Sequence, residues 1–577
     1  MPLIRTVPTK LAAVATAFLL SLGAGAAQGK GEVGAETSVA GTTEYGAYLA
    51  GRYAERESDF RTAAILLAKV LEEKPEDHRL RQRAFLLSLT AGLYDQAIRL
   101  ARELEETGQN GLTLSGELLA AEAILEGRYD EAKEQLTAIR RSAMARYSVP
   151  LALGWTEQGL GDTDAAVAAL QELDDESGFQ RLRSLHQGLI LEAGGRLDEA
   201  GERFAAVTEE PTDGPLRAVR ASGLLLERQG RKDEARALYD GFLEKNQSVF
   251  ALENDLRRLD EGGDVPYLVD GPAGGLSDGL YHLASGIRPN ADSFALAYAR
   301  LSLYLDPDNV LSRLLVGEVL EDRGRYREAI EEFNQIDRNS SYSWQARLSE
   351  ADSLEQLDEL DDAVALLEEM AAERGDRYEP LVRIGTFMHS RKRYKDAVDA
   401  FDRALARIAE LDSQDWILLY RRGMALERSK QWPRAEKDFL KALELQPDQP
   451  YVLNYLGYSW IEQGLYFDRA EDMLRKAVSL RENDGYIVDS LGWVLYRLGR
   501  YDEAVGHLED AVQLLPQDPV INDHLGDAYW RVGRKHEARF QWERALHLEP
   551  EEEGMIGKIE EKLRSGLGQP EEAKAKD

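Results

Sequence analysis

The stretch PVINDHLGDAYWRVGRKHEARFQWERALHLEP, residues 519–550, carries the pattern that decides the fold. A glycine stands at its eighth place, alanines stand at its twentieth and twenty-seventh places, and a proline ends it. Two earlier stretches, which begin at Trp416 and Gly485, have the same residue types at the same places. Glycine and alanine let two antiparallel helices approach closely, and proline cannot continue a helix. Each stretch therefore predicts one helical hairpin.

The alanine of the twentieth place recurs along most of the chain. The steps between its copies are 34 or 35 residues, except for one of 60 and one of 38. Self-similarity at this period, in a chain rich in helix formers, predicts an all-α solenoid of about fourteen hairpins between Glu44 and Pro550. The copies stand at residues 63, 97, 132, 166, 200, 235, 295, 329, 363, 397, 435, 470, 504 and 538.

This pattern closely resembles the tetratricopeptide repeat, and the resemblance covers most of the chain. It implies a right-handed superhelix in which the first helix of each hairpin lines a concave surface, chiefly through places 2, 5, 9, 12 and 13 of the repeat. A solenoid of this kind offers an extended binding surface and no built-in catalytic pocket. The resemblance therefore implies a non-catalytic scaffold that binds other proteins.

One segment rich in glycine and proline interrupts the repeats. It covers residues 259–275 and includes DEGGDVP at 260–266 and DGPAGG at 270–275. Because glycine and proline at this density break helices, we expect an N-terminal array at 44–258 and a C-terminal array at 276–550. The break itself is either a hinge or recognition loop, or a packed insertion that spaces two superhelices.

The N-terminus has the pattern of a secretory signal peptide over residues 1–27. Arg5 and Lys10 precede an apolar run at 11–22, and small residues follow it. A basic start, a short apolar core and a small-residue cleavage site are typical of such signals. The run is short for a membrane span, and an uncleaved anchor is the alternative. Residues 28–43 would then be a flexible leader, and a chain without cysteine suits the oxidising bacterial periplasm.

The last repeat is followed by a predicted capping helix at residues 551–567. Ile556, Ile559 and Leu563 stand there at helical spacing, which would let them cover the apolar face of the last hairpin. Residues 568–577 are charged and poor in apolar side chains, which predicts a disordered tail.

The formal net charge is −33, which argues against nucleic acid and against direct binding of anionic lipid. The same charge favours partners that present non-acidic or basic segments, although much of it is also expected simply from solvent-exposed acidic faces. No residue is predicted to be catalytic, and no cofactor or metal is predicted. The chain contains neither a phosphate-binding glycine loop nor a His-Glu-x-x-His motif, and Asp523, His524 and Asp527 would form an incomplete metal shell.

The functional signal is a set of aromatic residues at the groove-lining places of the last repeats. Large rings are favoured anchors at protein interfaces, and carboxylates beside them would suit a non-acidic peptide. The alternative is that the rings pack against the neighbouring hairpin or the capping helix, in which case the site would lie near the glycine-rich break. The predicted partner-binding residues are Tyr458, Asp489, Trp493, Tyr496, Asp523, Asp527 and Trp530.

The sequence thus predicts a scaffold or adaptor of the bacterial cell envelope that holds partner segments in its groove. The rival hypothesis is a scaffold that binds polysaccharide or is associated with exopolysaccharide export, because exposed rings also stack on sugars. An enzyme is not expected, because no block of residues remains to form a catalytic domain. The partner, the pathway and the oligomeric state stay open.

Overall fold

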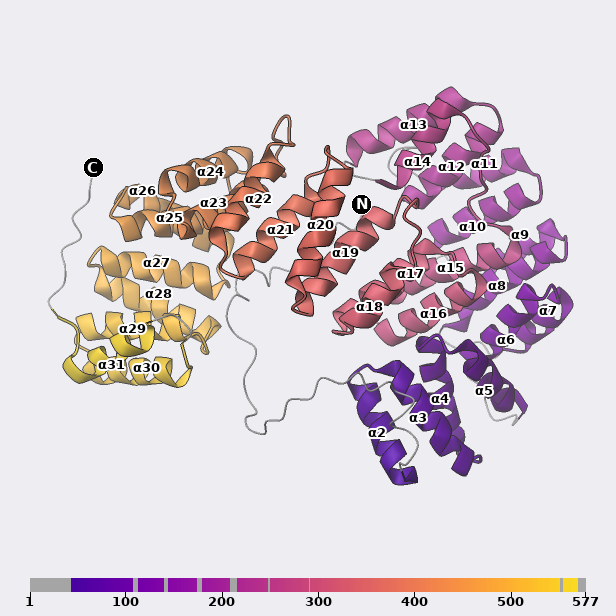
Figure 1. Cartoon of the computed structure of the whole chain (residues 1–577), viewed down its shortest axis with the longest axis horizontal. Helices are drawn as coiled ribbons and strands as arrows, with labels where there is room; N and C mark the ends of the chain where they lie inside the picture. The colour runs from indigo at the N-terminus through magenta and orange to yellow at the C-terminus, as the bar shows by residue number, and fades with distance from the viewer. Residues whose placement is uncertain are drawn as a thin grey trace. The chain divides into compact units, whose positions relative to one another are not determined.

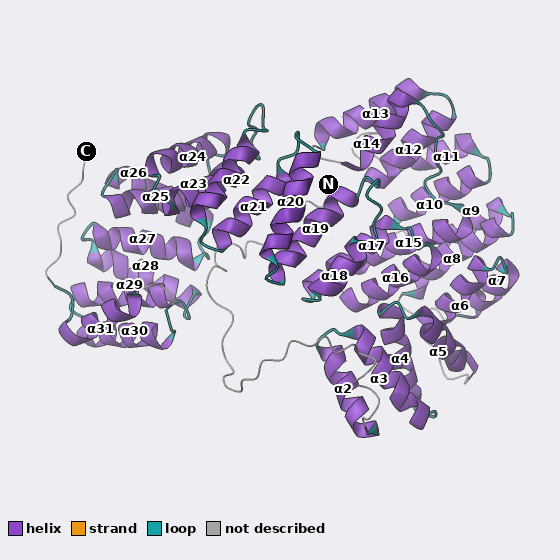
Figure 2. Ribbon diagram, viewed as in Figure 1, coloured by secondary structure: helices purple, strands orange, loops and turns teal. Residues whose placement is uncertain are grey.

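The computed structural model describes residues 43–106, 113–139, 144–173, 179–207, 215–246, 250–289, 291–550 and 554–568. These residues form thirty α-helices and two 3-10 helices and contain no strand, as Figure 2 shows. Within this part of the chain, none of the helices combines the length and the apolar character that crossing a membrane requires. The predicted signal peptide, all but Thr43 of the leader and all but Gly568 of the tail lie outside the described residues.

Twenty-eight of the helices pair into fourteen antiparallel hairpins, which appear in chain order in Figure 1. The first nine are α2 (Glu44–Arg56) with α3 (Phe60–Glu73), α4 (His78–Thr90) with α5 (Tyr94–Glu106), α6 (Thr113–Leu125) with α7 (Tyr129–Ala138), α8 (Ala145–Gly159) with α9 (Thr163–Ala169), α10 (Gln180–Ala193) with α11 (Leu197–Ala205), α12 (Leu216–Arg228) with α13 (Lys232–Lys245), α15 (Gly271–Ile287) with α16 (Asp292–Leu305), α17 (Val310–Asp322) with α18 (Tyr326–Phe333), and α19 (Ser343–Gln356) with α20 (Leu360–Glu373).

The last five hairpins are α21 (Glu379–Ser390) with α22 (Tyr394–Leu405), α23 (Trp416–Arg428) with α24 (Trp432–Leu445), α25 (Pro450–Gln463) with α26 (Phe467–Leu480), α27 (Gly485–Arg497) with α28 (Tyr501–Leu514), and α29 (Pro519–Arg531) with α30 (Lys535–His547). Two helices stand outside the hairpins, α14 (Glu253–Glu261) and α31 (Met555–Ser565), and the 3-10 helices are Leu170–Glu172 and Phe250–Leu252. The chain forms two compact units, of which one ends at Leu366 and the other continues from Leu367, within α20.

The recurring alanines of the twentieth place form an alanine ladder, which lies where the two helices of each hairpin pack together. All fourteen of its alanines are fully buried. In the last hairpin, a Cβ added to Gly526 would lie 2.5 Å from the Trp542 ring and 3.2 Å from the carbonyl oxygen of Ala538. The turns use glycine for a different reason, because residues such as Gly499 (φ 75°) adopt the left-handed conformation just past the first helix.

The glycine-rich break does not separate two arrays, which differs from the predicted division. Residues 271–275 form the first turns of α15, where a proline is tolerated because its missing N–H needs no partner there. The hairpin α15–α16 then turns back and packs against α4, α6, α8 and α10, which are first helices of earlier hairpins. Beside this contact, Tyr94, the first residue of α5, donates a hydrogen bond to the carbonyl of Arg300 of α16 at 2.9 Å. The first unit therefore fills part of its own groove.

The last hairpin is covered by α31, which lies inside the predicted range of the capping helix. Met555 and Ile559 are its buried residues, and Leu563 is half-buried. Ile556, which the sequence pattern placed on the buried face, is instead 48% exposed. Met555 and Ile559 are four residues apart and therefore lie on the same face of the helix, which is the buried one. Ile556 follows Met555 directly and lies off this face.

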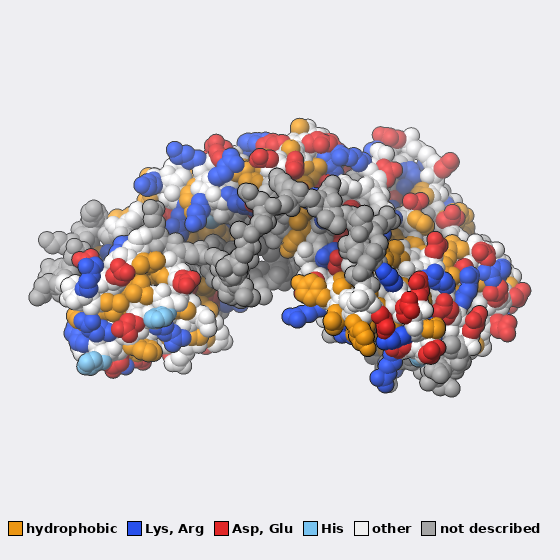
Figure 3. All heavy atoms as spheres, turned by 60° about the horizontal axis from the view of Figure 1, so that its bottom comes forward, with side chains coloured by type: hydrophobic (Ala, Val, Ile, Leu, Met, Phe, Trp, Pro, Cys, Tyr) orange, Lys and Arg blue, Asp and Glu red, His pale blue; other side chains and the backbone are white. Residues whose placement is uncertain are grey.

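Among the described residues, no helix covers the first helix of the first hairpin in this way. On α2, Tyr45, Leu49 and Tyr53 are spaced four residues apart and are 72%, 66% and 66% exposed. They share one face of the helix. Figure 3 shows hydrophobic side chains gathered on the surface of the first unit in this region. The array therefore begins with an open apolar face and ends with a closed one.

Candidate functional site

The structure brings two of the predicted site residues together on α27. The rings of Trp493 and Tyr496 stack with centroids 4.8 Å apart and an interplanar angle of 11°. Both are half-buried, and their spacing of three residues places them on one side of the helix. Trp493 also stacks on His524 of the next repeat, with centroids 4.0 Å apart. The Trp493 ring thus bridges two neighbouring first helices and keeps part of its surface accessible.

The polar edges of this aromatic pair are held by charged neighbours. The indole N–H of Trp493 donates to Glu462 of α25 at 2.9 Å, and Arg497 donates to the same carboxylate oxygen at 2.8 Å. The hydroxyl oxygen of Tyr496 accepts a hydrogen bond from Arg531 at 3.2 Å. These contacts fix the planes of both rings, because each polar atom of the pair already has a partner.

Asp489 does not edge an open groove. It is buried on α27, and both of its carboxylate oxygens lie 3.0 Å from Nδ1 of His524. Burial opposes the charged form of His524, but the Asp489 carboxylate outweighs burial and raises the pKa of this histidine. The contact is therefore a pairing between two repeats, in which the place-5 carboxylate of one first helix meets a base of the next.

Asp523 and Asp527 are engaged by the capping helix, which corrects their predicted place at the rim of the groove. Lys562 of α31 donates to Asp523 at 2.8 Å and to Asp527 at 2.9 Å. Asp527 also accepts the indole N–H of Trp542 at 2.9 Å. Burial, with a contribution from the nearby Asp523, raises the pKa of Asp527 to about 6 even though Lys562 lowers it. These two carboxylates therefore hold α31 on the last hairpin.

Trp530 also belongs to this closed end. Its ring meets Trp542 at 5.3 Å between centroids and lies under the Lys535 ammonium at 3.7 Å. Gly566, just past α31, stands so close to the Trp530 ring that a Cβ there would collide with it. Trp530 is half-buried by these neighbours, and the ring it contacts is the tilted Trp542 rather than the Trp493 pair.

Tyr458, the remaining predicted residue, lies half-buried on α25. Two residues at place 2 of the repeat are more exposed than any ring of the predicted set, namely Ile417 of α23 and Tyr486 of α27 at 43% and 40%. The second unit therefore presents a row of large apolar side chains along its first helices. The one feature of the sequence that could have added Ile417 and Tyr486 to the predicted site is their position at place 2 of the repeat.

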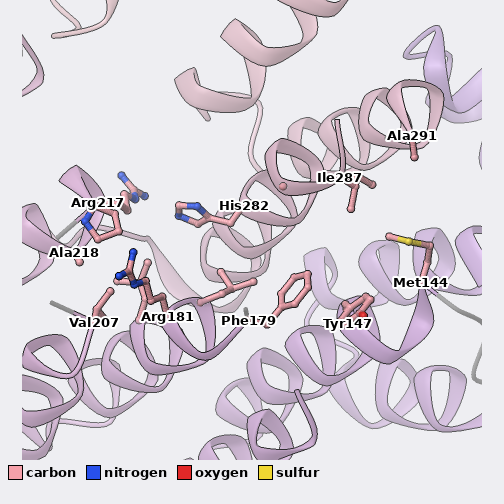
Figure 4. A pocket seen from close by; sticks show the side chains of 14 residues that line it. Met144, Tyr147, Phe179, Arg181, Val207, Arg217, Ala218, His282, Ile287 and Ala291 are labelled. Carbon is pink, nitrogen blue, oxygen red and sulfur yellow. The ribbon is translucent and has the colours of Figure 1, made fainter. Parts of the chain in front are cut away.

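A second candidate site is a pocket of about 600 Å³ in the first unit. It lies between the first turns of α8, α10 and α12 on one side and the last turns of α15 on the other, as Figure 4 shows. Sequence reasoning named the neighbourhood of the glycine-rich break as the alternative place for a site, and it named none of the pocket residues. The pocket is the part of the groove that α15 leaves unfilled.

Comparison with known proteins agrees with the repeat structure. Tetratricopeptide repeat models match residues 185–248, 318–380, 416–449 and 488–518. No curated protein matches the chain.

Three solved structures illustrate the structural likeness. The Cut9–Hcn1 hetero-tetramer structure of the APC/C is 16% identical with a TM-score of 0.38, over 92% of this chain and 98% of that one. YrrB, described as a tetratricopeptide-repeat protein with an unusual peptide-binding site, is 20% identical with a TM-score of 0.27, over 34% and 97%. MamA from Desulfovibrio magneticus RS-1 is 20% identical with a TM-score of 0.27, over 30% and 94%.

The fourteen hairpins and the matched repeats together make this chain a tetratricopeptide-repeat protein. This fold suggests a scaffold for interactions between proteins.

Proposed function

We propose that the protein is a non-catalytic scaffold of the bacterial cell envelope that holds partner segments along the first helices of its second unit. The observation that carries the proposal is the half-exposed stack of Trp493 and Tyr496. Rigid aromatic side chains with fixed planes bury much apolar area at little entropic cost, which makes them favoured anchors for a partner. Two further exposed apolar side chains belong to first helices of this unit, Tyr486 on α27 itself and Ile417 on the earlier helix α23.

The charges near the stack define which partner segments suit it. Glu462 pairs with Arg497 beside Trp493, and His524 pairs with Asp489. Lys562 is shared by Asp523 and Asp527. The groove is therefore expected to select partner segments through contacts with its aromatic rings more than through charge. We infer that the partner segment is non-acidic and carries aromatic or large aliphatic side chains, since the acidic surface elsewhere would repel an acidic one.

The location in the envelope rests on the signal-like N-terminus and the absence of cysteine. The expected result is cleavage near Ala26 or Ala27, after the small residues that follow the apolar run. Mass measurement of the chain purified from a periplasmic fraction would show this. A chain that keeps Met1 and stays in the cytoplasm would contradict the location and leave the binding proposal standing.

The binding proposal is tested with a peptide library displayed on phage and panned against the full chain. Peptides that bind should lose affinity about 30-fold when Trp493 is replaced by alanine, since a central aromatic anchor contributes about 2 kcal/mol. Isothermal titration calorimetry with synthetic copies of the selected peptides gives the affinity. Unfolding curves show whether the variant keeps its fold.

The matched control is Phe540→Ala, which removes an exposed aromatic ring on α30, a second helix of the same unit. This variant should bind the peptides as the unchanged protein does. Equal losses for Trp493→Ala and Phe540→Ala, or no loss for either, would place the binding surface elsewhere. Enrichment of strongly acidic peptides would contradict the inferred partner chemistry.

A further inference from the structure

We propose that the pocket of the first unit binds a small amphipathic anion, an apolar chain that ends in a single carboxylate. This ligand is distinct from the partner segments of the second unit, so the two proposals stand or fall separately. The pocket is polarised, and its two ends carry different chemistry. In Figure 4 the labelled cationic side chains lie toward one end, while Met144, Tyr147 and Ile287 lie toward the other.

The apolar part is built from the first turns of α8 and α10 and the end of α15. Tyr147 and Phe179 stack with ring centroids 4.3 Å apart, which gives this end a rigid aromatic wall. Leu182, Leu185 and Ile287 complete it. An apolar chain that leaves water for such a wall gains about 0.8 kcal/mol for each buried methylene. Pockets of about 300–1,000 Å³ with mostly apolar lining are typical of small-molecule sites.

The charged residues that line the pocket are two arginines, Arg181 of α10 and Arg217 of α12, although the chain has 104 acidic and 71 basic residues. His282 of α15 also lines the pocket. Among the described residues, no carboxylate lines the pocket, and the nearest acid of the surrounding cluster, Asp278, is almost fully buried beneath it. The described lining therefore carries a charge opposite in sign to that of the molecule, which favours an anion.

Arg217 is held in place by groups behind the pocket. Its Nη2 forms an ion pair with Asp278 and donates to the carbonyl of Leu268 at 3.3 Å. Burial would raise the pKa of Asp278, but the Arg217 guanidinium lowers it, so the carboxylate stays ionised and anchors the guanidinium. No described residue accepts a hydrogen bond from Nη1 of Arg217. A fixed guanidinium with a free donor is the usual partner of a carboxylate.

Two histidines of this region are neutral, His186 behind the pocket and His282 in its lining. Burial lowers the pKa of His186 to about 3 and lowers the pKa of His282. Nδ1 of His186 accepts the indole N–H of Trp155 at 3.2 Å, so its proton is carried on Nε2, toward Asp278. The cluster therefore supplies one cation, Arg181, beyond the balanced Arg217–Asp278 pair. One excess positive charge matches a ligand with one negative charge.

The test titrates the full chain with decanoate, below the concentration at which decanoate forms micelles, and follows binding by calorimetry. Acetate supplies the carboxylate without the chain, and decyltrimethylammonium supplies the chain with the opposite charge. Decanoate should bind, and each of the other two should bind at least about tenfold more weakly. Equal binding of decanoate and decyltrimethylammonium would overturn the proposal.

Two variants locate the binding. Gly286 lines the pocket, and a Cβ added there meets no atom within 4 Å, so Gly286→Phe should fill the pocket without strain and abolish decanoate binding. Gly506 of α28 has the same free space in the second unit, and Gly506→Phe should leave binding unchanged. Decanoate binding that survives Gly286→Phe would overturn the site.

Arg181→Gln should weaken decanoate about tenfold, the effect expected for one charge-assisted hydrogen bond, and should leave the binding of decyltrimethylammonium no weaker. Arg203→Gln on α11 changes the net charge equally at a residue outside the pocket lining and should have no such effect. Equal losses for the two arginine variants would show that only the overall charge matters and would overturn the assignment of Arg181.

Discussion

Replacing Lys562 by methionine is expected to destabilise the closed end of the second unit by about 3–5 kcal/mol, the usual effect of removing one partner from a buried ion pair. The ammonium lies 2.8 Å from Asp523 and 2.9 Å from Asp527, and both carboxylates are largely shielded from water. Without it, two negative charges face each other with no cation between them. Urea unfolding, read by tryptophan fluorescence and by hydrogen exchange of α29–α31, measures the loss.

The controls separate this charge effect from loss of the helix. Lys558→Met removes an exposed lysine one turn earlier on α31 and should change stability by less than about 0.5 kcal/mol. Adding Asp523→Asn and Asp527→Asn to Lys562→Met should recover most of the loss, since no buried charge then remains. If Lys562→Met behaves like Lys558→Met, the lysine does not bind these carboxylates.

Replacing Gly275 by leucine is expected to destabilise the first unit by about 3 kcal/mol. A Cβ at Gly275 would collide with the indole of Trp155, which is fully buried, and overpacking of a rigid core costs about 1–3 kcal/mol or more. Trp155 cannot turn away cheaply, because its N–H donates to His186. Thermal and urea unfolding of the full chain measure the effect.

Gly286→Leu is the matched control, since it lies on the same helix and a Cβ there meets nothing within 4 Å. It should be neutral or should stabilise α15, because glycine is about 1 kcal/mol poorer than other residues inside a helix. Equal stability of the two variants would mean that α15 is not packed on α8. That result would return the break to the role of a hinge.

The helical hairpins could be read from the sequence because their contacts are local. The alanine ladder joins two helices that are adjacent in the chain, so a period of 34 residues carries both helix positions and their packing. The pairing of Trp493 and Tyr496 could be predicted for the same reason, since residues three positions apart on one helix lie on the same side of it. The alanine period and the spacing of the two aromatic residues are both properties of single hairpins.

The other features of the fold and of the candidate site depend on contacts that sequence spacing does not encode. Asp523 and Asp527 have the spacing of residues at the rim of the groove. Only the contact with Lys562, which is 39 residues after Asp523, shows that they are paired. Gly275 has the composition of a linker, yet its missing side chain is what admits Trp155 from 120 residues earlier. Glycine marks both loops and close packing, and the partner alone distinguishes the two.

The two ends of the array differ in what they would accept. An additional repeat placed before Glu44 would meet Leu49 and Tyr53, and covering their exposed apolar surface would stabilise the junction by about 25 cal/mol for each Å² removed from water. An additional repeat placed after α30 would have to displace α31 and strip Asp523 of its cation. Among the described residues, the array can therefore be lengthened by design before α2, whereas α31 closes it after α30.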